Sequence, residues 1–441
     1  MEVERRERAI QLGMLSQPSY GKNPTVQAKP FAIPKRLVFE AYKRVKARKG
    51  VGGVDDQSIE DFESNLSTNL YKLWNRLSSG SYHPSPVKRV YIAKADGKKR
   101  PLGIPTVEDR IAQMVVKMVI EPELENHFHP DSYGYRPGKS AHQALRKTLE
   151  RSRKHAWVID MDIKGFFDNL DHRLMMKAVR HHVKERWARI YIYRWLRATV
   201  QHPDGTQEQM FKGTPQGGVI SPLLANLYLH YTFDMWMERN YPSIKFERYA
   251  DDIVCHCTHQ AQSEQLIAEL GRRFNACGLE LHPEKTKIVY CKSVYRRGGY
   301  PIVSFEFLGY QFKPKLIRNR HGKYAVYFMA GISPKAAANI REQIRQMPWR
   351  KWQPLGIETI QAHCQNRLKG WINYFKLFGV VQIREVLFHF DTCLRKWIAH
   401  KMKKTLLQAA KCVNGIRRSA RHLFAHWGIW STKKGWVAGA V

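Results

Sequence analysis

Several features that mark other protein classes are missing from this sequence. None of its seven cysteines belongs to a C-x-x-C pair, which argues against a disulfide framework and favours a reduced compartment. No run of about eighteen uninterrupted apolar residues occurs, so we expect no membrane span. Residues 1–10 are charged and lack the apolar core of a signal peptide. These absences predict a cytoplasmic protein with no membrane partner.

Acidic residues are also scarce. The chain has 74 Lys and Arg against 38 Asp and Glu, which gives a formal net charge of +36. In residues 311–441 the imbalance is larger, with 25 Lys and Arg against four acids. Such an excess of positive charge on a folded protein indicates a nucleic-acid partner.

Tryptophans are interspersed among those cations, at Trp349, Trp352, Trp371, Trp397, Trp427, Trp430 and Trp436. Aromatic rings among cations suit stacking on unpaired bases. The spacing of Trp371 from Leu368 and Phe375 instead matches a helix stripe that faces a core, so we expect Trp371 to pack internally. The last three tryptophans are less periodic, and both RNA contact and packing remain open for them.

Cys255 and Cys257 flank His256 in a run of strand-forming residues, so both thiols are expected on one face of a strand. A zinc site there requires at least one further ligand, and the sequence shows none. Buried free thiols are the favoured interpretation.

Two adjacent carboxylates, Asp251 and Asp252, lie between short β-prone runs at residues 243–248 and 253–257. The pattern predicts a β-hairpin with both acids at its tip. Mg²⁺ prefers a few carboxylates together with water and substrate phosphates, so such a tip suits a nucleotide-dependent metal site. The alternative is a polar turn that happens to contain two acids.

A second acidic cluster favours the metal site. Residues 158–163 are predicted to form a buried strand in which Asp160 and Asp162 share one face. The chain then turns, and Asp171 is expected to cap the helix that begins near His172. Two-metal phosphoryl transfer requires carboxylates from separate strands that converge on metals about 3.5–4 Å apart. The two clusters together predict such a site.

Three motifs make the chain resemble reverse transcriptases, in the version carried by group II intron-encoded reverse transcriptase/maturases. They are Asp-Ile-Lys-Gly-Phe-Phe-Asp at residues 162–168, Gly-Thr-Pro-Gln-Gly-Gly-Val-Ile-Ser-Pro at residues 213–222 and Tyr-Ala-Asp-Asp at residues 249–252. Further blocks agree in order, at residues 41–55, 100–105, 132–138, 281–287, 307–310 and 370–375. The resemblance covers roughly residues 35–405.

The resemblance implies an α+β fold, a right-hand polymerase with fingers and palm and an α-helical thumb or maturase (X) domain. The expected regions are a flexible N-terminal lead (1–34), an N-terminal extension (35–85), fingers (86–150), a catalytic palm (151–312), a thumb/maturase domain (313–404) and a basic C-terminal tail (405–441) with room for a reduced DNA-binding region. The patterns predict helices over residues 107–119, from Ser263 to Cys277, and over residues 334–347, 357–377 and 383–403.

The resemblance also assigns the catalytic residues. Asp162, Asp251 and Asp252 match the family's catalytic carboxylates and would hold two Mg²⁺ ions, with Asp162 and Asp251 as direct ligands. Phe167 matches the aromatic residue under the deoxyribose, whose ring would exclude a 2′-hydroxyl. Core packing is the alternative for Phe167, and it is the expected role of Phe166.

Four residues match the positions that bind the incoming dNTP. Lys94 and Arg100 would grip the triphosphate, because ammonium and guanidinium groups both bind phosphate. Gln216 would line the nucleotide pocket, and Lys285 would lie near the triphosphate. Solvated surface cations are the alternative for the basic residues. In the thumb, six cations are expected to contact RNA: Arg367, Lys369, Arg395, Lys396, Lys403 and Lys404.

The implied function is an RNA-directed DNA polymerase and maturase that binds its intron RNA, assists splicing and copies the RNA into cDNA. Its partners would be intron RNA, target DNA and dNTPs, in the bacterial cytoplasm and at nucleoid DNA during insertion, and its oligomeric state is left open. A relative adapted to RNA spacer acquisition or phage defence would have the same palm. A non-enzymatic RNA chaperone is disfavoured by the three intact carboxylates.

Longer relatives carry a C-terminal endonuclease with paired cysteines and a His-Asn-His metal site. No such residues follow Cys412. We therefore expect no DNA-cutting domain in this sequence.

Overall fold

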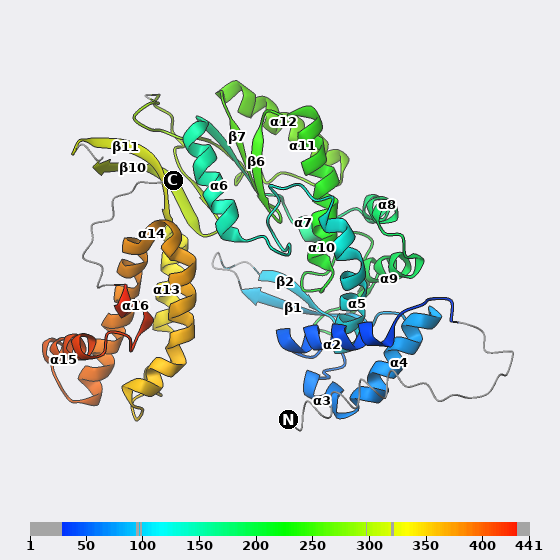
Figure 1. The fold of residues 1–441 in the computed structure, drawn as a ribbon, viewed down its shortest axis with the longest axis horizontal. Coiled ribbons are helices and arrows are strands. Elements are labelled where there is room, and N and C mark those ends of the chain that lie inside the picture. The colour runs from blue at the N-terminus through cyan, green and yellow to red at the C-terminus, as the bar shows by residue number, and fades with distance from the viewer. Residues whose placement is uncertain (1–28, 94–96, 98, 297, 319–321, 430–441) are drawn as a thin grey trace.

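The computed structural model describes residues 29–93, 97, 99–296, 298–318 and 322–429. Lys94, Trp430 and Trp436 lie outside the described residues. Figure 1 shows the N-terminal helices at the lower right, a central sheet flanked by helices at the top, and a separate group of long helices at the lower left. Helices and strands both occur in the catalytic region, which confirms the expected α+β class.

The N-terminal helices pack together against a long helix of the fingers region. They are α2 (Lys35–Arg48), α3 (Ile59–Ser64) and α4 (Leu66–Ser79), and they lie near α5 (Val107–Glu125). A capping box formed by Ser58 and Asp61 starts α3. The helix predicted to begin at Val107 begins there, and it runs six residues beyond the predicted end at Val119.

A four-stranded sheet in the order β2-β1-β4-β5 joins the region expected to form the fingers to strands from the region expected to form the palm. Its strands are β1 (Val87–Ala93), β2 (Lys99–Ile104), β4 (Thr199–Gln201) and β5 (Gln207–Gln209). Strands β1 and β2 are antiparallel over six residue pairs, whereas β1 and β4 are parallel. This sheet joins residues 87–104 to a segment about a hundred positions later, just before the Pro-Gln-Gly-Gly loop.

The palm is built on an antiparallel sheet with the order β6-β7-β3-β8. The strands are β3 (Trp157–Met161), β6 (Lys245–Tyr249), β7 (Asp252–Cys257) and β8 (Lys287–Tyr290). Strands β6 and β7 form the predicted hairpin, and Tyr249 pairs with Asp252 at its tip. The central strands β7 and β3 carry the two acidic clusters at the same end of the sheet.

The two faces of the palm sheet are covered by different layers. Ile159, Met161 and Ile253 point into one core, whereas Val158 and Val254 point into the other. The first core contains helices α7 (Phe166–Asn169), α8 (His172–His182), α9 (Arg186–Leu196), α10 (Ser221–Leu229), the π-helix η1 (His230–Asp234), α11 (Met235–Asn240) and α12 (Gln260–Ala276). Helix α6 (Ala141–Lys154) lies on the opposite side (Figure 1).

The structure confirms one predicted helix start and contradicts another. Asp171 caps α8, because its carboxylate accepts a hydrogen bond from the backbone N–H of Leu174 at 2.8 Å, as predicted. The prediction that a helix begins at Ser263 is wrong. Helix α12 begins at Gln260, its N-cap residue is His259, and Ser263 is buried within the first turns.

A three-stranded sheet in the order β11-β10-β9 spans the expected boundary between palm and thumb, and helices follow it. The strands are β9 (Phe305–Phe307), β10 (Tyr310–Arg318) and β11 (Tyr324–Ile332), and the helices are α13 (Pro334–Arg345), α14 (Ile357–Lys401), α15 (Leu406–Ser419) and α16 (Ala425–Gly428). Helix α14 is kinked at Gly379, where the backbone is non-helical. The kink lies between the two helices predicted for this stretch.

The described part of the tail packs against the thumb. Asp391 on α14 is fully buried and accepts hydrogen bonds from His426 at 2.8 Å and from the Trp427 indole at 2.9 Å. Trp427 is itself 1% exposed, which settles its role as packing. Trp352 and Trp397 are also buried, and Trp371 packs against the same core as expected. Most tryptophans in the described part of the thumb and tail therefore pack in the core and are not available for base stacking.

All seven cysteines are free, and Cys255 and Cys257 are buried as predicted. Among the described residues no group of three or more His, Cys, Asp or Glu side chains is arranged to hold a metal ion. None of the helices in this part of the chain combines the length and apolar character that crossing a bilayer requires.

The substitution Asp391→Ala should loosen the tail from the thumb. It would leave the buried polar groups of His426 and Trp427 without their acceptor, which costs about 1–3 kcal/mol per unsatisfied group. Thermal unfolding should show a lower midpoint than for Glu385→Ala, which removes an exposed acid from the same helix and should change stability by less than about 0.5 kcal/mol. Equal midpoints for the two variants would contradict this role.

Candidate active site

The three predicted catalytic carboxylates converge at one end of the palm sheet. Asp162 directly follows β3, Asp251 lies in the turn before β7, and Asp252 begins β7. The register pairs Met161 with Ile253, so Asp162 and Asp252 come next to each other on neighbouring strands. Side chains alternate along a strand, and Asp160 therefore shares their face.

The turn that carries Asp251 has an uncommon backbone. Ala250 is buried and has a φ of +57°, a left-handed conformation that residues other than glycine seldom adopt. The turn lies directly against Gly134, where a Cβ atom would overlap the backbone nitrogen of Ala250. Gly134 is thus required for the close approach of two segments that are more than a hundred residues apart in the sequence.

A buried arginine, Arg248, holds this turn in place through hydrogen bonds. Arg248 is 0% exposed, and its guanidinium donates to both carboxylate oxygens of Asp234, at 2.7 and 2.6 Å. One nitrogen, Nη1, also donates to the side-chain oxygen of Asn226 at 2.9 Å and to the carbonyl of Ala250 at 3.3 Å. Asn226 in turn donates to the carbonyl of Gly134 at 2.7 Å. These bonds hold both sides of the contact between Gly134 and Ala250.

A π-helical turn presents the partner of this arginine. Asp234 is fully buried and is the last residue of η1, which follows α10 directly. Its pKa is lowered, because the attraction of Arg248 outweighs the cost of burying the charge. Single π-helical turns are frequent at functional sites. Here the π-helical turn η1 carries Asp234, whose ion pair with Arg248 on β6 is fully buried.

The carboxylates repel one another. Desolvation and the neighbouring Asp251 and Asp162 charges raise the pKa of Asp252 to about 7. Desolvation and the Asp252 charge likewise raise the pKa of Asp160 to about 7, and the pKa of Asp251 is raised mainly by desolvation. The cluster therefore has more negative charge than its surroundings neutralise, which is the electrostatic condition for binding a cation.

Lys285 supplies one positive charge to the cluster. Its Nζ lies 2.7 Å from Oδ2 of Asp162, so the predicted phosphate-binding lysine is paired with a carboxylate. The carboxylates do not form a closed ligand set by themselves. Their donor chemistry suits Mg²⁺, which takes one or two protein carboxylates and completes its shell with water and substrate phosphates.

Two residues predicted to bind the dNTP contact each other. Arg100 on β2 donates from Nε to the side-chain oxygen of Gln216 at 2.9 Å. The backbone N–H of Gly103 donates to the Gln216 carbonyl at 2.6 Å, so the fingers sheet is joined to the Pro-Gln-Gly-Gly loop. Lys94, the third of the predicted residues in this region, lies outside the described residues.

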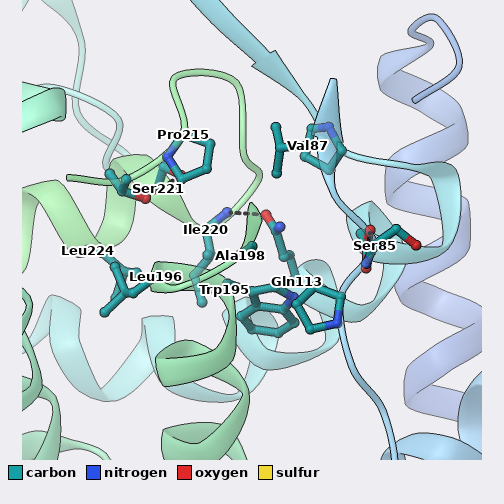
Figure 2. A pocket seen from close by; sticks show the side chains of 14 residues that line it. Ser85, Val87, Gln113, Trp195, Leu196, Ala198, Pro215, Ile220, Ser221 and Leu224 are labelled. Atoms are coloured by element: carbon teal, nitrogen blue, oxygen red, sulfur yellow. Dashed lines mark hydrogen bonds between the residues drawn. The ribbon is translucent and has the colours of Figure 1, made fainter. Parts of the chain in front are cut away.

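The back of the Pro-Gln-Gly-Gly loop is anchored on α5. The side-chain oxygen of Gln113 accepts a hydrogen bond from the N–H group of Val219 at 2.8 Å. It accepts another from the N–H group of Ile220 at 3.4 Å, which Figure 2 shows. Thr214 and Ser221 close the loop with a hydroxyl–hydroxyl bond of 3.0 Å. The cavity drawn in Figure 2 has a volume of about 10 Å³, so it is packing space behind the loop and has no room for a nucleotide.

Phe167 lies at the edge of the core, beside the Pro-Gln-Gly-Gly loop. Its ring is half-buried and meets the buried ring of Phe166 edge-on, with centroids 5.2 Å apart. Its carbonyl accepts from the N–H of Thr214 at 2.8 Å, which places it beside the Pro-Gln-Gly-Gly loop. Both of the roles considered for Phe167 remain compatible with this position.

Several residues of the site were not found by sequence reasoning. They include Arg248, Asp234 and Asn226. Asp234 and Asn226 have a signal in retrospect, because they are polar residues in the mostly apolar stretch of α10 and η1. Tyr135 is 54% exposed, and its ring lies 6.3 Å from that of Tyr249. Desolvation and the nearby Asp251 charge raise the pKa of Tyr135, so this ring borders the carboxylate cluster.

Most of the thumb cations predicted to bind RNA are exposed to solvent. Arg367, Lys369, Lys396, Lys403 and Lys404 are exposed. Arg395 is half-buried, with its guanidinium 4.9 Å from the centre of the Phe388 ring. Arg367 and Lys369 are two positions apart on α14 and therefore point to different sides of the helix.

Known proteins share both halves of this architecture. Residues 92–312 match the family described as reverse transcriptase (RNA-dependent DNA polymerase), and residues 337–413 match the group II intron, maturase-specific domain. Protein YkfC of Escherichia coli is 34% identical over 336 residues, which cover 68% of this chain and 84% of that protein.

Two further relatives are encoded in introns. The group II intron-encoded protein LtrA of Lactococcus lactis is 38% identical over 198 residues, 44% of this chain and 32% of LtrA. A 91 kDa protein in the cob intron of Schizosaccharomyces pombe is 24% identical over an alignment of 446 positions, 85% of this chain and 54% of that protein. This chain thus spans about a third to a half of these two relatives. It belongs to the reverse transcriptase (RNA-dependent DNA polymerase) family and carries a group II intron maturase-specific domain.

Proposed function

We propose that the protein binds its own intron RNA, assists the splicing of that RNA and copies it into cDNA during intron mobility. The observation that carries the proposal is the convergence of Asp162, Asp251 and Asp252 at the end of the palm sheet, in a chain that also has a maturase-specific domain. The DNA target and dNTPs are the other expected partners, and the proposed location is the bacterial cytoplasm and nucleoid.

The carboxylates would hold two Mg²⁺ ions, with Asp162 and Asp251 as direct ligands. Such ions supply activation of the primer 3′-hydroxyl and stabilise charge on the triphosphate. The chain contributes the geometry, because β3 and β7 set the spacing of the carboxylates and Arg248 fixes the turn between β6 and β7. Asp160 shares the strand face and adds to the negative potential.

The remaining residues would position the nucleotide. Arg100 points at Gln216 from the fingers side, and its guanidinium suits a triphosphate oxygen. Lys285 would exchange its contact with Asp162 for a phosphate when metal and dNTP are bound. Phe167 would lie under the sugar and exclude a 2′-hydroxyl. The exposed thumb cations would bind RNA phosphates at many points.

The substitution Asp251→Ala should abolish cDNA synthesis while leaving RNA binding and splicing assistance intact. Loss of a metal ligand removes several kcal/mol of charge stabilisation, which corresponds to a decrease of about a thousandfold in primer extension. RNA binding rests on distributed cations, and the RNA itself performs the splicing chemistry in this proposal. Primer-extension, filter-binding and splicing assays on the same preparation measure all three.

Glu264→Ala, which removes an exposed acid on α12, is the control and should extend primers normally. Near wild-type extension by the Asp251→Ala protein would show that Asp251 is not a metal ligand. Loss of splicing assistance together with extension would show that the two functions are not separable as proposed.

The substitution Phe167→Val should raise incorporation of rNTPs relative to dNTPs. Removing the ring opens space for one hydroxyl, and a change of this size in a pocket alters discrimination by about 10- to 200-fold. Competition between rNTP and dNTP in single-nucleotide extension gives the ratio. Phe166→Val is the matched control, because that ring is 2% exposed and its loss should lower the melting temperature without changing selectivity. An unchanged ratio with a lowered melting temperature for Phe167→Val would support core packing instead.

A further inference from the structure

A large hollow lies on the outer side of the palm helices. It has a volume of about 750 Å³ and is bordered by α8, the end of α10, η1, α11 and the end of α12. These helices pack on the sheet face that carries Ile159 and Met161, whereas the acids Asp160 and Asp162 alternate to the other face. The helix layer therefore separates the hollow from the carboxylate cluster.

The hollow is lined by cations without acids. Lys177 and Arg180 come from α8, Arg239 from α11 and Arg273 from α12, and the lining includes no Asp or Glu. Lys177 and Arg180 are three residues apart and share one face of their helix. In the described part of the chain no acid lies within ion-pairing distance of Lys177, Arg180 or Arg239. Their charges are therefore not neutralised within the protein.

One of the four cations is fixed in place. Arg273 is half-buried and donates to the backbone carbonyls of Thr232 at 3.1 Å and Tyr231 at 2.9 Å. Both carbonyls belong to η1, the same π-helical turn that presents Asp234 to Arg248. Arg273 thus contributes a fixed positive charge to the hollow. Its hydrogen-bond acceptors are neutral carbonyl oxygens, so they do not neutralise that charge.

Aromatic and apolar side chains form part of the same lining. Tyr231 and Trp236 are half-buried, and Met235 is 36% exposed. Trp236 rests against the ring of Tyr241 with centroids 5.5 Å apart, and the Tyr231 hydroxyl is held by His182 at 2.5 Å. The rings are supported from behind while one side of each borders the hollow.

We propose that this hollow binds an unpaired nucleotide of RNA. The base would rest against Tyr231 and Trp236, and the flanking phosphates would contact Lys177, Arg180 and Arg239. Supported aromatic rings beside cations are how proteins hold single-stranded nucleic acid, and a volume of this size is typical of small-ligand pockets. The inference rests on the proposed function, which makes RNA the partner, and it adds a contact on the side of the palm away from the polymerase cleft.

Such a contact allows the protein to hold RNA while its cleft is occupied. An RNA strand bound at the hollow would not compete with primer and template, because the helix layer lies between the two surfaces. An acidic protein segment would use the same cations but would gain little from the rings. This difference distinguishes the two occupants experimentally.

The test compares two triple variants of the full chain with equal change in net charge. The first is Lys177→Glu, Arg180→Glu and Arg239→Glu. The control is Arg173→Glu, Lys245→Glu and Arg272→Glu, three exposed palm cations that do not line the hollow. The probe is a 20-nucleotide single-stranded RNA of mixed sequence, added to protein already saturated with a primer–template duplex.

We expect at least a tenfold loss of affinity for the first variant and less than a twofold loss for the control. The salt slope of log K should fall by about two, because each single-strand phosphate contact contributes about 0.7. Primer extension should stay within twofold of wild type for both variants. A 4-thiouridine in the probe should crosslink to residues 231–240 of the wild-type protein.

Equal affinities of the two triple variants, or crosslinks confined to other regions, would overturn the assignment. A parallel loss of binding to poly-glutamate and to RNA, with no crosslink to residues 231–240, would assign the hollow to acidic protein segments and would also overturn it. Failure of the wild-type protein to bind any RNA would overturn the proposed function as well. That result is distinguishable, because the first two outcomes require a wild-type protein that binds.

Discussion

Arg248 and Asp234 form a bidentate ion pair inside the palm, and neither side chain is exposed to solvent. Burying two charges is costly, and the cost is offset only when the geometry is good and the remaining donors are satisfied. Here the remaining donor capacity is directed at Asn226 and at the carbonyl of Ala250. The left-handed turn that carries Asp251 is thereby tied to α10 and η1, so the carboxylates depend on a charge pair that never meets substrate.

The same helices connect the two sides of the palm. The π-helical turn η1 ends in Asp234, which supports the carboxylate turn, and its carbonyls at Tyr231 and Thr232 hold Arg273 at the outer hollow. The thumb is organised by a second buried acid, Asp391, which fastens the tail to α14. In both regions a buried carboxylate joins separate elements, Asp234 to Arg248 fourteen positions along the chain and Asp391 to His426 thirty-five positions along, in a chain where acids are scarce.

Local patterns in the sequence were sufficient for the carboxylate hairpin, for the Asp171 cap and for the division of the thumb helices near Gly379. Local patterns did not predict features that are set by tertiary packing, such as the start of a helix. Helix α12 begins at Gln260 and not at Ser263, because β7 ends at Cys257 and the chain must reverse at once to place Leu266, Leu270 and Phe274 on the sheet.

The pattern of charges in the sequence likewise did not predict which side chains are buried. The tryptophans among the thumb cations suggested base stacking, but Trp352, Trp397 and Trp427 are buried by helices that are basic only on their outer faces. Arg248 is one of 74 basic residues, and nothing local distinguishes it from the solvated ones. Its role follows from Asp234, whose direction depends on a π-helical turn that periodicity does not predict.

The measurement that tests the central claim most directly is the Mg²⁺ dependence of primer extension by the Arg248→Lys protein. Lysine keeps the charge but cannot reproduce the fork of the guanidinium, so the turn should lose its tie to Ala250 while the fold persists. The account predicts a kcat lowered by at least about tenfold, equivalent to about 1.4 kcal/mol, a raised Mg²⁺ requirement and a KM for dNTP within twofold of wild type. A stably folded Arg248→Lys protein with wild-type kcat and Mg²⁺ requirement would contradict it.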